Sequence, residues 1–271
     1  MNNLDSKIKI NSKGSTLQKI GSLVKFRMVK FLNSDLSKLI KRKSQYNIYG
    51  QDHLFFSHPF LDKMTLIEDG LANYTCVKRS LYSYLLLPHK IFGKSKKIKN
   101  ILLTGLSSYP PKLEKKITTI NLKEKWGSLH ENNKNKINDI FNYKKTSNKK
   151  YDVLILTQPI SEYSLVSESE KLSIYKKIIQ LHSENSENTL LRIHPREKTD
   201  YSKLGYNIKI NNEPYPIEIL LLNTHSFKKA ITLYSTAIYS LSCDEKIIYG
   251  TSLSSALEKK IGYIPYQEII S

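Results

Sequence analysis

The second half of the chain alternates short apolar runs with longer segments of helical periodicity, and no other feature constrains the fold as strongly. The apolar runs predict strands at 153–156, 190–193, 207–210, 230–233 and 246–249. Between them, the spacing of apolar residues predicts helices over 168–182, 217–222 and 236–241. Strands that alternate with helices favour a parallel sheet with right-handed crossovers, in which ligands bind at the carboxyl ends of the strands.

The first half carries a less regular version of this pattern. Apolar runs predict strands at 47–50, 65–67 and 101–104, with a helix over 77–87. A chain of 271 residues is long enough to bury the cores of two modest Rossmann-like lobes. We therefore expect an α/β fold with a parallel sheet in each lobe. The amino-terminal lobe is expected to be abbreviated, because the first convincing strand begins only near Ile48.

The segment 132–150 is rich in Asn and Lys, and we place the lobe boundary within it. This choice divides the chain into an amino-terminal lobe, 1–145, and a carboxy-terminal lobe, 146–271.

The charge of the chain is strongly positive, with 43 Lys and Arg against 24 Asp and Glu. A formal net charge of +19 predicts attraction to polyanions such as nucleic acids, anionic lipids or acidic glycans. Residues 16–33 have the pattern of an amphipathic basic helix. This helix could contact an anionic membrane, or it could be a lobe helix with solvated lysines. No nucleic-acid-binding signature accompanies the charge, so we rank a nucleic-acid-binding protein below an enzyme.

The cysteines and the hydropathy pattern indicate a cytoplasmic protein. Cys76 and Cys243 are far apart and show no CxxC spacing, so neither a disulfide framework nor a zinc site is indicated. The sequence contains no secretory signal pattern and no run approaching the ~20 apolar residues of a transmembrane helix.

Two carboxylates follow the predicted strand at 65–67. They are Glu68 and Asp69, and Gly70 after them permits a sharp turn. A carboxylate in this position could take a proton from a hydroxyl group of a substrate. Adjacent acids at a strand end are also common as helix caps or solvated turn residues, so both interpretations stand.

A His-Pro pair, His194-Pro195, follows the predicted strand at 190–193. An imidazole can donate a proton or a hydrogen bond near neutral pH, which a departing phosphate group requires. A second pair, His58-Pro59, lies in an aromatic loop, where a packing or turn role is the better interpretation.

Two hydroxyl residues, Ser235 and Thr236, stand where the strand at 230–233 gives way to a helix. Free backbone amides and the helix dipole favour an anion at such a junction, although Ser and Thr are also ordinary N-cap residues. The loop after the strand at 153–156 holds Gln158 and Glu162, which are expected to border a bound substrate.

Several common site motifs are absent. Gly93-Lys94-Ser95 resembles the end of a P-loop, but the glycine required five positions earlier is Pro88. The sequence contains no Asp-x-Asp to hold a divalent metal on a nucleotide diphosphate. A phosphate site in this chain is therefore expected to use basic side chains, hydroxyls and amides, with no metal ion and no other cofactor.

The order of these motifs resembles the bacterial sialyltransferases of glycosyltransferase family 52, which include lipooligosaccharide and capsule α-2,3-sialyltransferases. The motifs are Glu68-Asp69-Gly70, His194-Pro195 and Ser235-Thr236, and the stretch from Tyr49 to Tyr74 is also similar. The resemblance covers about residues 45–250.

This resemblance implies a GT-B-like fold of two Rossmann-like lobes, the first on the acceptor side and the second binding the CMP-sugar. It implies inverting transfer of sialic acid from CMP-sialic acid to a galactose-containing acceptor, by an enzyme that acts as a homodimer. Asp69 would be the general base, supported by Glu68, with Glu162 in reserve. His194 would protonate or hydrogen-bond the departing phosphate, and Ser235 and Thr236 would hold it. The alternative is a glycosyltransferase of the same GT-B-like fold that uses another nucleotide sugar as its donor.

Overall fold

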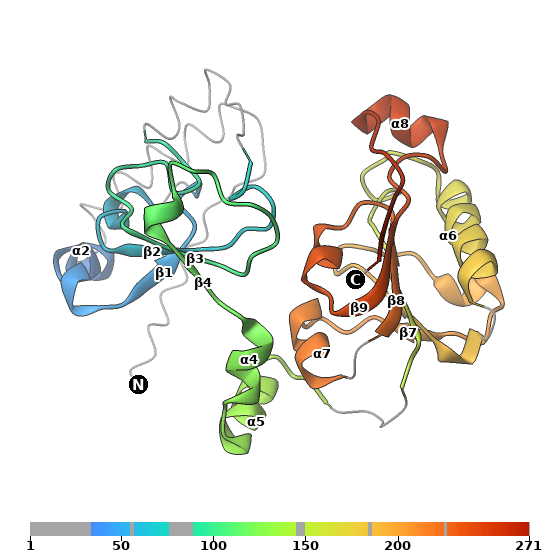
Figure 1. Ribbon diagram of the computed structural model, residues 1–271, viewed down its shortest axis with the longest axis horizontal. Helices are drawn as coiled ribbons and strands as arrows, with labels where there is room; N and C mark the ends of the chain where they lie inside the picture. The colour runs from blue at the N-terminus through green and yellow to red at the C-terminus, as the bar shows by residue number, and fades with distance from the viewer. Residues whose placement is uncertain are drawn as a thin grey trace. The chain divides into compact units, whose positions relative to one another are not determined.

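The computed structural model describes residues 34–54, 57–75, 89–144, 150–183, 186–224 and 227–270. The chain forms two compact units, Met1–Ile120 and Asn121–Ser271. Each unit contains its own sheet (Figure 1). The helices predicted over 16–33 and 77–87 lie outside the described residues. No helix within the described ranges combines the length and the apolarity needed to cross a lipid bilayer.

The first unit is built on a four-stranded sheet in the order β1-β2-β3-β4, with every pair of neighbours parallel. Its strands are β1 Ile48–Gly50, β2 Met64–Ile67, β3 Asn100–Leu103 and β4 Ile117–Thr119. The first three confirm the predicted strands. The fourth was missed, because two of its three residues are exposed threonines and leave no apolar run to detect. Two short helical segments precede β1, namely α2 Ser34–Lys41 and η1 Lys43–Gln45, and two lie between strands, namely η2 His58–Phe60 and η3 Glu114–Lys116.

The stretch that resembles a P-loop has a structural role. The amides of Phe92 and Gly93 donate hydrogen bonds of 2.7 and 2.8 Å to the carboxylate of Asp52, a buried residue. Gly93 has a φ of +77°, and a Cβ atom there would lie 2.4 Å from Cδ1 of Ile101. Two amides at the start of this stretch are therefore already occupied by a carboxylate.

The second unit is built on a six-stranded sheet in the order β10-β9-β8-β5-β6-β7. Its strands are β5 Val153–Leu156, β6 Thr189–Arg192, β7 Lys209–Asn211, β8 Phe227–Thr232, β9 Cys243–Ile248 and β10 Gln267–Ile270. All neighbours are parallel except β10, which pairs antiparallel with β9. Together the two sheets confirm the expected α/β fold with Rossmann-like parallel sheets of the GT-B type.

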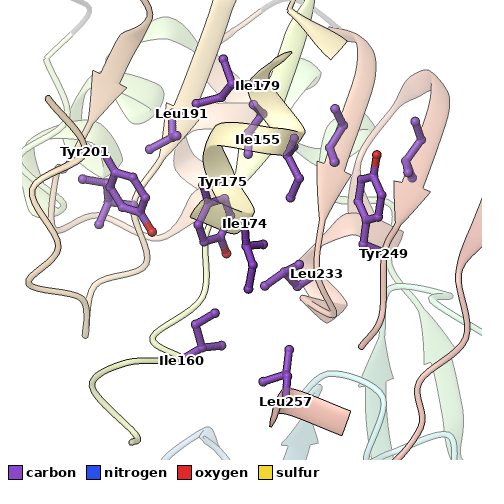
Figure 2. Close-up of a cluster of buried hydrophobic side chains, with 14 of the residues drawn as sticks. Ile155, Ile160, Ile174, Tyr175, Ile179, Leu191, Tyr201, Leu233, Tyr249 and Leu257 are labelled. Carbon is purple, nitrogen blue, oxygen red and sulfur yellow. The ribbon is translucent and has the colours of Figure 1, made fainter. Parts of the chain in front are cut away.

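Side chains on β5 alternate between the two faces of this sheet. Ile155 packs in a cluster with residues of α6 Glu168–His182, including Ile174 and Tyr175. Figure 2 shows this cluster, in which the Tyr175 and Tyr201 rings meet edge to face with centroids 5.4 Å apart. Leu154 and Leu156 pack on the opposite face with α7 Ile217–Asn223. A central parallel strand is thus covered on both faces (Figure 1).

Two helices precede this sheet and belong to the same unit. They are α4 Leu122–Gly127 and α5 Glu131–Ile140. The side-chain amides of Asn138 and Asn223 exchange two hydrogen bonds of 3.0 and 2.9 Å, which join α5 to α7. The segment 132–150, in which the lobe boundary was placed, therefore contains most of α5. Its Asn and Lys residues form a helix without buried side chains, which has no apolar stripe to detect. The boundary proposed after residue 145 lies beyond both helices, whereas the compact units meet at residues 120 and 121.

The remaining elements of the second unit are η4 Ser186–Asn188, η5 Tyr201–Leu204, η6 Thr236–Ser240 and α8 Ser255–Ile261. The sequence analysis did not predict α8 or β10. The α-helix predicted over 236–241 is instead the short 3₁₀ helix η6.

Candidate functional site

The second sheet reverses its strand order at β5. The chain runs from β5 through β6 to β7 on one side, and then returns to β8 and β9 on the other side. Leu156, the last residue of β5, pairs with Arg192 of β6 and with Thr232 of β8. In open parallel sheets, ligands bind beyond the carboxyl ends of the strands at such a reversal.

Three of the predicted site residues lie in the loops that leave these neighbouring strands. Gln158 follows β5, His194 follows β6, and Ser235 follows β8. The Oγ1 atom of Thr232 donates to the carbonyl oxygen of Leu156 and accepts a hydrogen bond from the amide of Ser235. The ends of β5 and β8 are thereby tied together, and the three residues share one edge of the sheet.

Ser235 and Thr236 form the junction that was expected to bind phosphate. Ser235 is the N-cap of η6, but its side chain makes no capping hydrogen bond among the described residues. Ser235 is half-buried and Thr236 is exposed. Because η6 has only five residues, its dipole is weaker than that of the predicted α-helix. An anion here would depend on the hydroxyl groups and on local amides.

His194 begins a tight turn that accounts for the proline after it. The amide of Glu197 donates to the carbonyl oxygen of His194 over 2.9 Å, and Pro195 occupies the second position, where its fixed φ suits a turn. The amide of Arg196 donates to Nδ1 of His194 over 3.2 Å. Since Nδ1 accepts a hydrogen bond, the proton of the neutral ring resides on Nε2, which is left as a donor.

The pKa of His194 lies below the usual range of histidine. Burial of the ring is the main cause, because it disfavours the charged form. Glu197 opposes this effect, while Arg196, Lys171 and Arg192 add to it. The ring is therefore neutral at neutral pH and offers an Nε2–H group for hydrogen bonding.

A buried network of charged groups lies under the His194 turn. The ammonium of Lys171 lies 2.8 Å from Oε2 of Glu162 and 2.7 Å from Oε2 of Glu197. Burial alone would raise the pKa of Glu162, but the hydrogen bonds from Lys171 and from the amide of Lys198 lower it to about 2. Glu162 is thus a carboxylate held in an ion pair.

The sequence analysis missed Lys171 and Glu197. Both residues have a detectable signal in the sequence. Lys171 stands at helical spacing with Ile174, Tyr175 and Ile178, so it occupies the apolar face of α6. Glu197 stands three residues after His194, at the last position of the turn that Pro195 indicates.

In the first unit, Glu68 joins the carboxyl ends of β2 and β3. Its carboxylate accepts hydrogen bonds of 2.7 Å from both the amide and the hydroxyl of Thr104, and one of 2.5 Å from the hydroxyl of Tyr74. The Tyr74 oxygen in turn accepts from the amides of Gly105 and Leu106. Burial and the Glu68 carboxylate raise the pKa of Tyr74 to about 12, so the phenol remains a donor. Glu68 is committed to structural contacts.

Asp69 has fewer partners than Glu68. Its side chain is 43% exposed, and its Oδ2 atom lies 3.4 Å from Nε2 of His53. Gly70 has a φ of 57°, a left-handed conformation that favours glycine, and it turns the chain sharply after the two acids. The amide of Asp69 donates to Oδ1 of Asn73, which closes the turn. Of the two acids, Asp69 is the more exposed to solvent.

The competing His-Pro pair has a turn role, as expected. His58 and Pro59 open η2, and the His58 ring lies 5.4 Å from the ring of His89.

No group of three His, Cys, Asp or Glu side chains within the described ranges is close enough to hold a metal ion. An open pocket of about 700 Å³ lies beside the His194 turn, between the β5–α6 loop and α8. Its lining includes Glu162, Lys198 and Lys260, but not His194.

The chain is similar in sequence to known proteins. A family model described as glycosyltransferase family 52 matches residues 2–257. An uncharacterized protein of Haemophilus influenzae is 37% identical over 242 residues, which are 84% of this chain and 77% of the relative.

Proposed function

The chain belongs to glycosyltransferase family 52, and from this premise we propose that it transfers sialic acid from CMP-sialic acid to a galactose-containing acceptor of a bacterial surface glycan. As a member of this family it is a glycosyltransferase, which uses a nucleotide-sugar donor and a glycan acceptor. The lipooligosaccharide or capsule of the cell is the proposed source of the acceptor.

One observation carries the choice of donor. His194 presents an Nε2–H donor at the carboxyl edge of a parallel sheet, and the half-buried hydroxyl residue Ser235 follows a strand at the same edge. The leaving group CMP is a nucleoside monophosphate, and sialic acid adds a carboxylate of its own. Hydrogen-bond donors and cationic side chains can stabilise these two anions directly. We therefore propose a reaction that needs no metal ion and no other cofactor.

In the proposed reaction, an acceptor hydroxyl attacks the anomeric carbon of sialic acid. A new carbon–oxygen bond forms on one face, while the bond to the CMP phosphate oxygen breaks on the other and leaves its electron pair on that oxygen. Asp69 takes the hydroxyl proton, and Nε2 of His194 donates a hydrogen bond to the departing phosphate, which leaves as an anion. Displacement from the opposite face inverts the configuration of the carbon.

The contacts of the three acidic candidates favour Asp69 as the base. Glu68 accepts three hydrogen bonds within its own unit, and Glu162 is paired with Lys171. A carboxylate with a pKa of about 2 is also a weak base at neutral pH. We propose that Glu68 supports the reaction only by fixing the strand end that carries Asp69, and that Gln158, Glu162, Ser235 and Thr236 border the donor. Gly70 and Pro195 shape the turns that carry Asp69 and His194.

The remaining proposals concern the partners. We propose that the protein acts in the cytoplasm and, from the family resemblance, that it acts as a homodimer. Its net charge of +19 favours contact with anionic lipid at the membrane surface. Nucleic acid is not among the proposed partners.

The decisive experiment is incubation with CMP-sialic acid and a lactose-type acceptor, followed by mass analysis of the product. The expected product is heavier than the acceptor by one sialic acid residue, and CMP is released in equal amount. Parallel reactions with other nucleotide sugars test the alternative donor. Transfer from one of these, with none from CMP-sialic acid, would refute the donor proposed here.

A further inference from the structure

Glu197 holds the backbone of His194 from two directions. The amide of Glu197 donates to the carbonyl oxygen of His194 over 2.9 Å. In return, Oε1 of Glu197 accepts a hydrogen bond of 3.0 Å from the amide of His194. The main chain and the side chain of one residue thus fix both polar backbone groups of the histidine.

Glu197 is itself fixed by three further donors. Its carboxylate accepts hydrogen bonds from the hydroxyls of Thr157 and Tyr201, at 2.5 and 2.7 Å. It also pairs with Lys171, and both of these side chains are fully buried, with 0% exposure. Thr157 comes from the β5 loop, Tyr201 from η5 and Lys171 from α6. The carboxylate therefore occupies a position that three separate elements define.

The same network connects the two loops that carry predicted site residues. Glu162 belongs to the β5–α6 loop, and its Oε1 atom accepts a hydrogen bond of 2.7 Å from the amide of Lys198. Its Oε2 atom pairs with Lys171, which also holds Glu197. The loop after β5 and the loop after β6 are therefore joined by one buried ammonium between two carboxylates.

Stability alone gives little reason for such a network. Taking charges out of water costs free energy, and apolar residues of similar volume often replace buried ion pairs without loss. Here the network instead sets the place of an imidazole and the charge beneath it. The charged groups that face His194 are Glu197, Arg196, Lys171 and Arg192, and Glu197 is the acid among them.

We propose that Glu197 is a positioning residue for His194, and that Lys171 is the cation that keeps the Glu197 carboxylate in place. This inference rests on the proposed role of His194 as hydrogen-bond donor to the departing phosphate. The network has two functions. It aligns the His194 turn with the β5 loop, and it places a negative charge beneath the ring that offsets the cations facing it.

Two variants separate these functions. Glu197→Gln keeps the size and the acceptor oxygen of the side chain but removes the charge. Glu197→Asp keeps the charge but is shorter by one methylene group, so it loses reach to the amide of His194. Glu258→Gln, which changes an exposed carboxylate on α8, is the matched control.

The first measurement is the pKa of His194 by NMR titration of the histidine ring protons, with His194→Gln to assign the signal. The pKa is expected to fall in Glu197→Gln, because the remaining charged neighbours are cations, and to stay near the wild-type value in Glu197→Asp and Glu258→Gln. If Glu197 served only the stability of the fold, its variants would have altered melting temperatures, but the pKa of His194 would not differ between Glu197→Gln and Glu197→Asp. An unchanged pKa in a folded Glu197→Gln protein would overturn the proposed charge effect.

The second measurement is the rate of transfer. Glu197→Asp is expected to lower kcat on the order of 10- to 100-fold with little change in the acceptor KM, because the donor group is displaced from its place in the transition state. A kcat of Glu197→Asp equal to that of the wild type would refute the positioning role. If Glu197→Gln does not fold, Glu197→Asp by itself still tests this role. Because the NMR titration needs no donor, it still tests the network if CMP-sialic acid proves to be the wrong donor.

Discussion

The imidazole of His53 lies beside the carboxylate of Asp69, with Nε2 and Oδ2 separated by 3.4 Å. This pair leaves Asp69 about half exposed, whereas the neighbouring Glu68 is occupied by Tyr74 and Thr104. Of two adjacent acids at the end of β2, one is therefore a structural residue and the other is accessible.

The first prediction follows from this difference. Asp69→Asn removes the proposed base and is expected to lower kcat by about 10²–10⁴-fold, the usual contribution of general base catalysis, while the fold is retained. Steady-state kinetics and circular dichroism measure the two effects. The matched control is Asp62→Asn, which removes another carboxylate of the same unit, 2.5 Å from Lys43. Near-normal turnover of Asp69→Asn would exclude this residue as the base.

The second prediction concerns the two His-Pro pairs. His194→Ala is expected to abolish measurable transfer, because the departing phosphate loses its Nε2–H donor. His58→Ala is expected to retain transfer, since His58 opens the short helix η2. Initial rates of both variants at equal concentrations of folded protein provide the comparison. Equal activity of the two variants would contradict the assignment of roles.

The third prediction is a pH dependence of stability that arises from Glu162. The folded-state pKa is about 2 and the ordinary value is 4.5, so the pairing stabilises the fold fully above pH 4.5 and is lost as the pH falls towards 2. Glu162→Gln is expected to lower the free energy of unfolding at pH 7 by about 1.5–3 kcal/mol, the range for hydrogen bonds to charged groups. Urea unfolding at pH 7, 4 and 3 measures the difference from wild type. A difference that does not shrink at low pH would show that the ion pair is not its source.

The fourth prediction concerns metal ions. EDTA is expected to leave the transfer rate essentially unchanged, because the proposed site stabilises the phosphate with hydrogen-bond donors. Rates measured before and after chelation, and after addition of Mn²⁺, test this expectation. A large loss that Mn²⁺ restores would require a metal in the reaction.

The fifth prediction concerns the membrane. The protein is expected to cosediment with vesicles that contain anionic lipid, and not with neutral vesicles, since its net charge is +19. Binding should weaken as the salt concentration rises, because salt screens exposed charges over about 10 Å at 0.1 M. Binding that is equal for both kinds of vesicle would argue against an electrostatic contact.

Elements with a strong apolar pattern were predictable from the sequence. The predicted bounds of β5 and α6 agree with the structure at both ends. The helix α5 was missed because its side chains bury no apolar stripe, and β10 was missed because it is an antiparallel edge strand whose residues are half-buried or exposed. Periodicity reports the burial of a face, so elements that bury little leave no pattern in the sequence.

The sequence by itself determined which residues stand at the ends of strands, and therefore that Asp69, His194 and Ser235 are candidates for the site. Only the tertiary structure decided the state of each candidate. Glu68 meets Thr104 across 36 positions of sequence, and Glu162 meets Lys171 from another element. The availability of a carboxylate depends on partners that folding brings to it, and one-dimensional patterns do not contain those contacts.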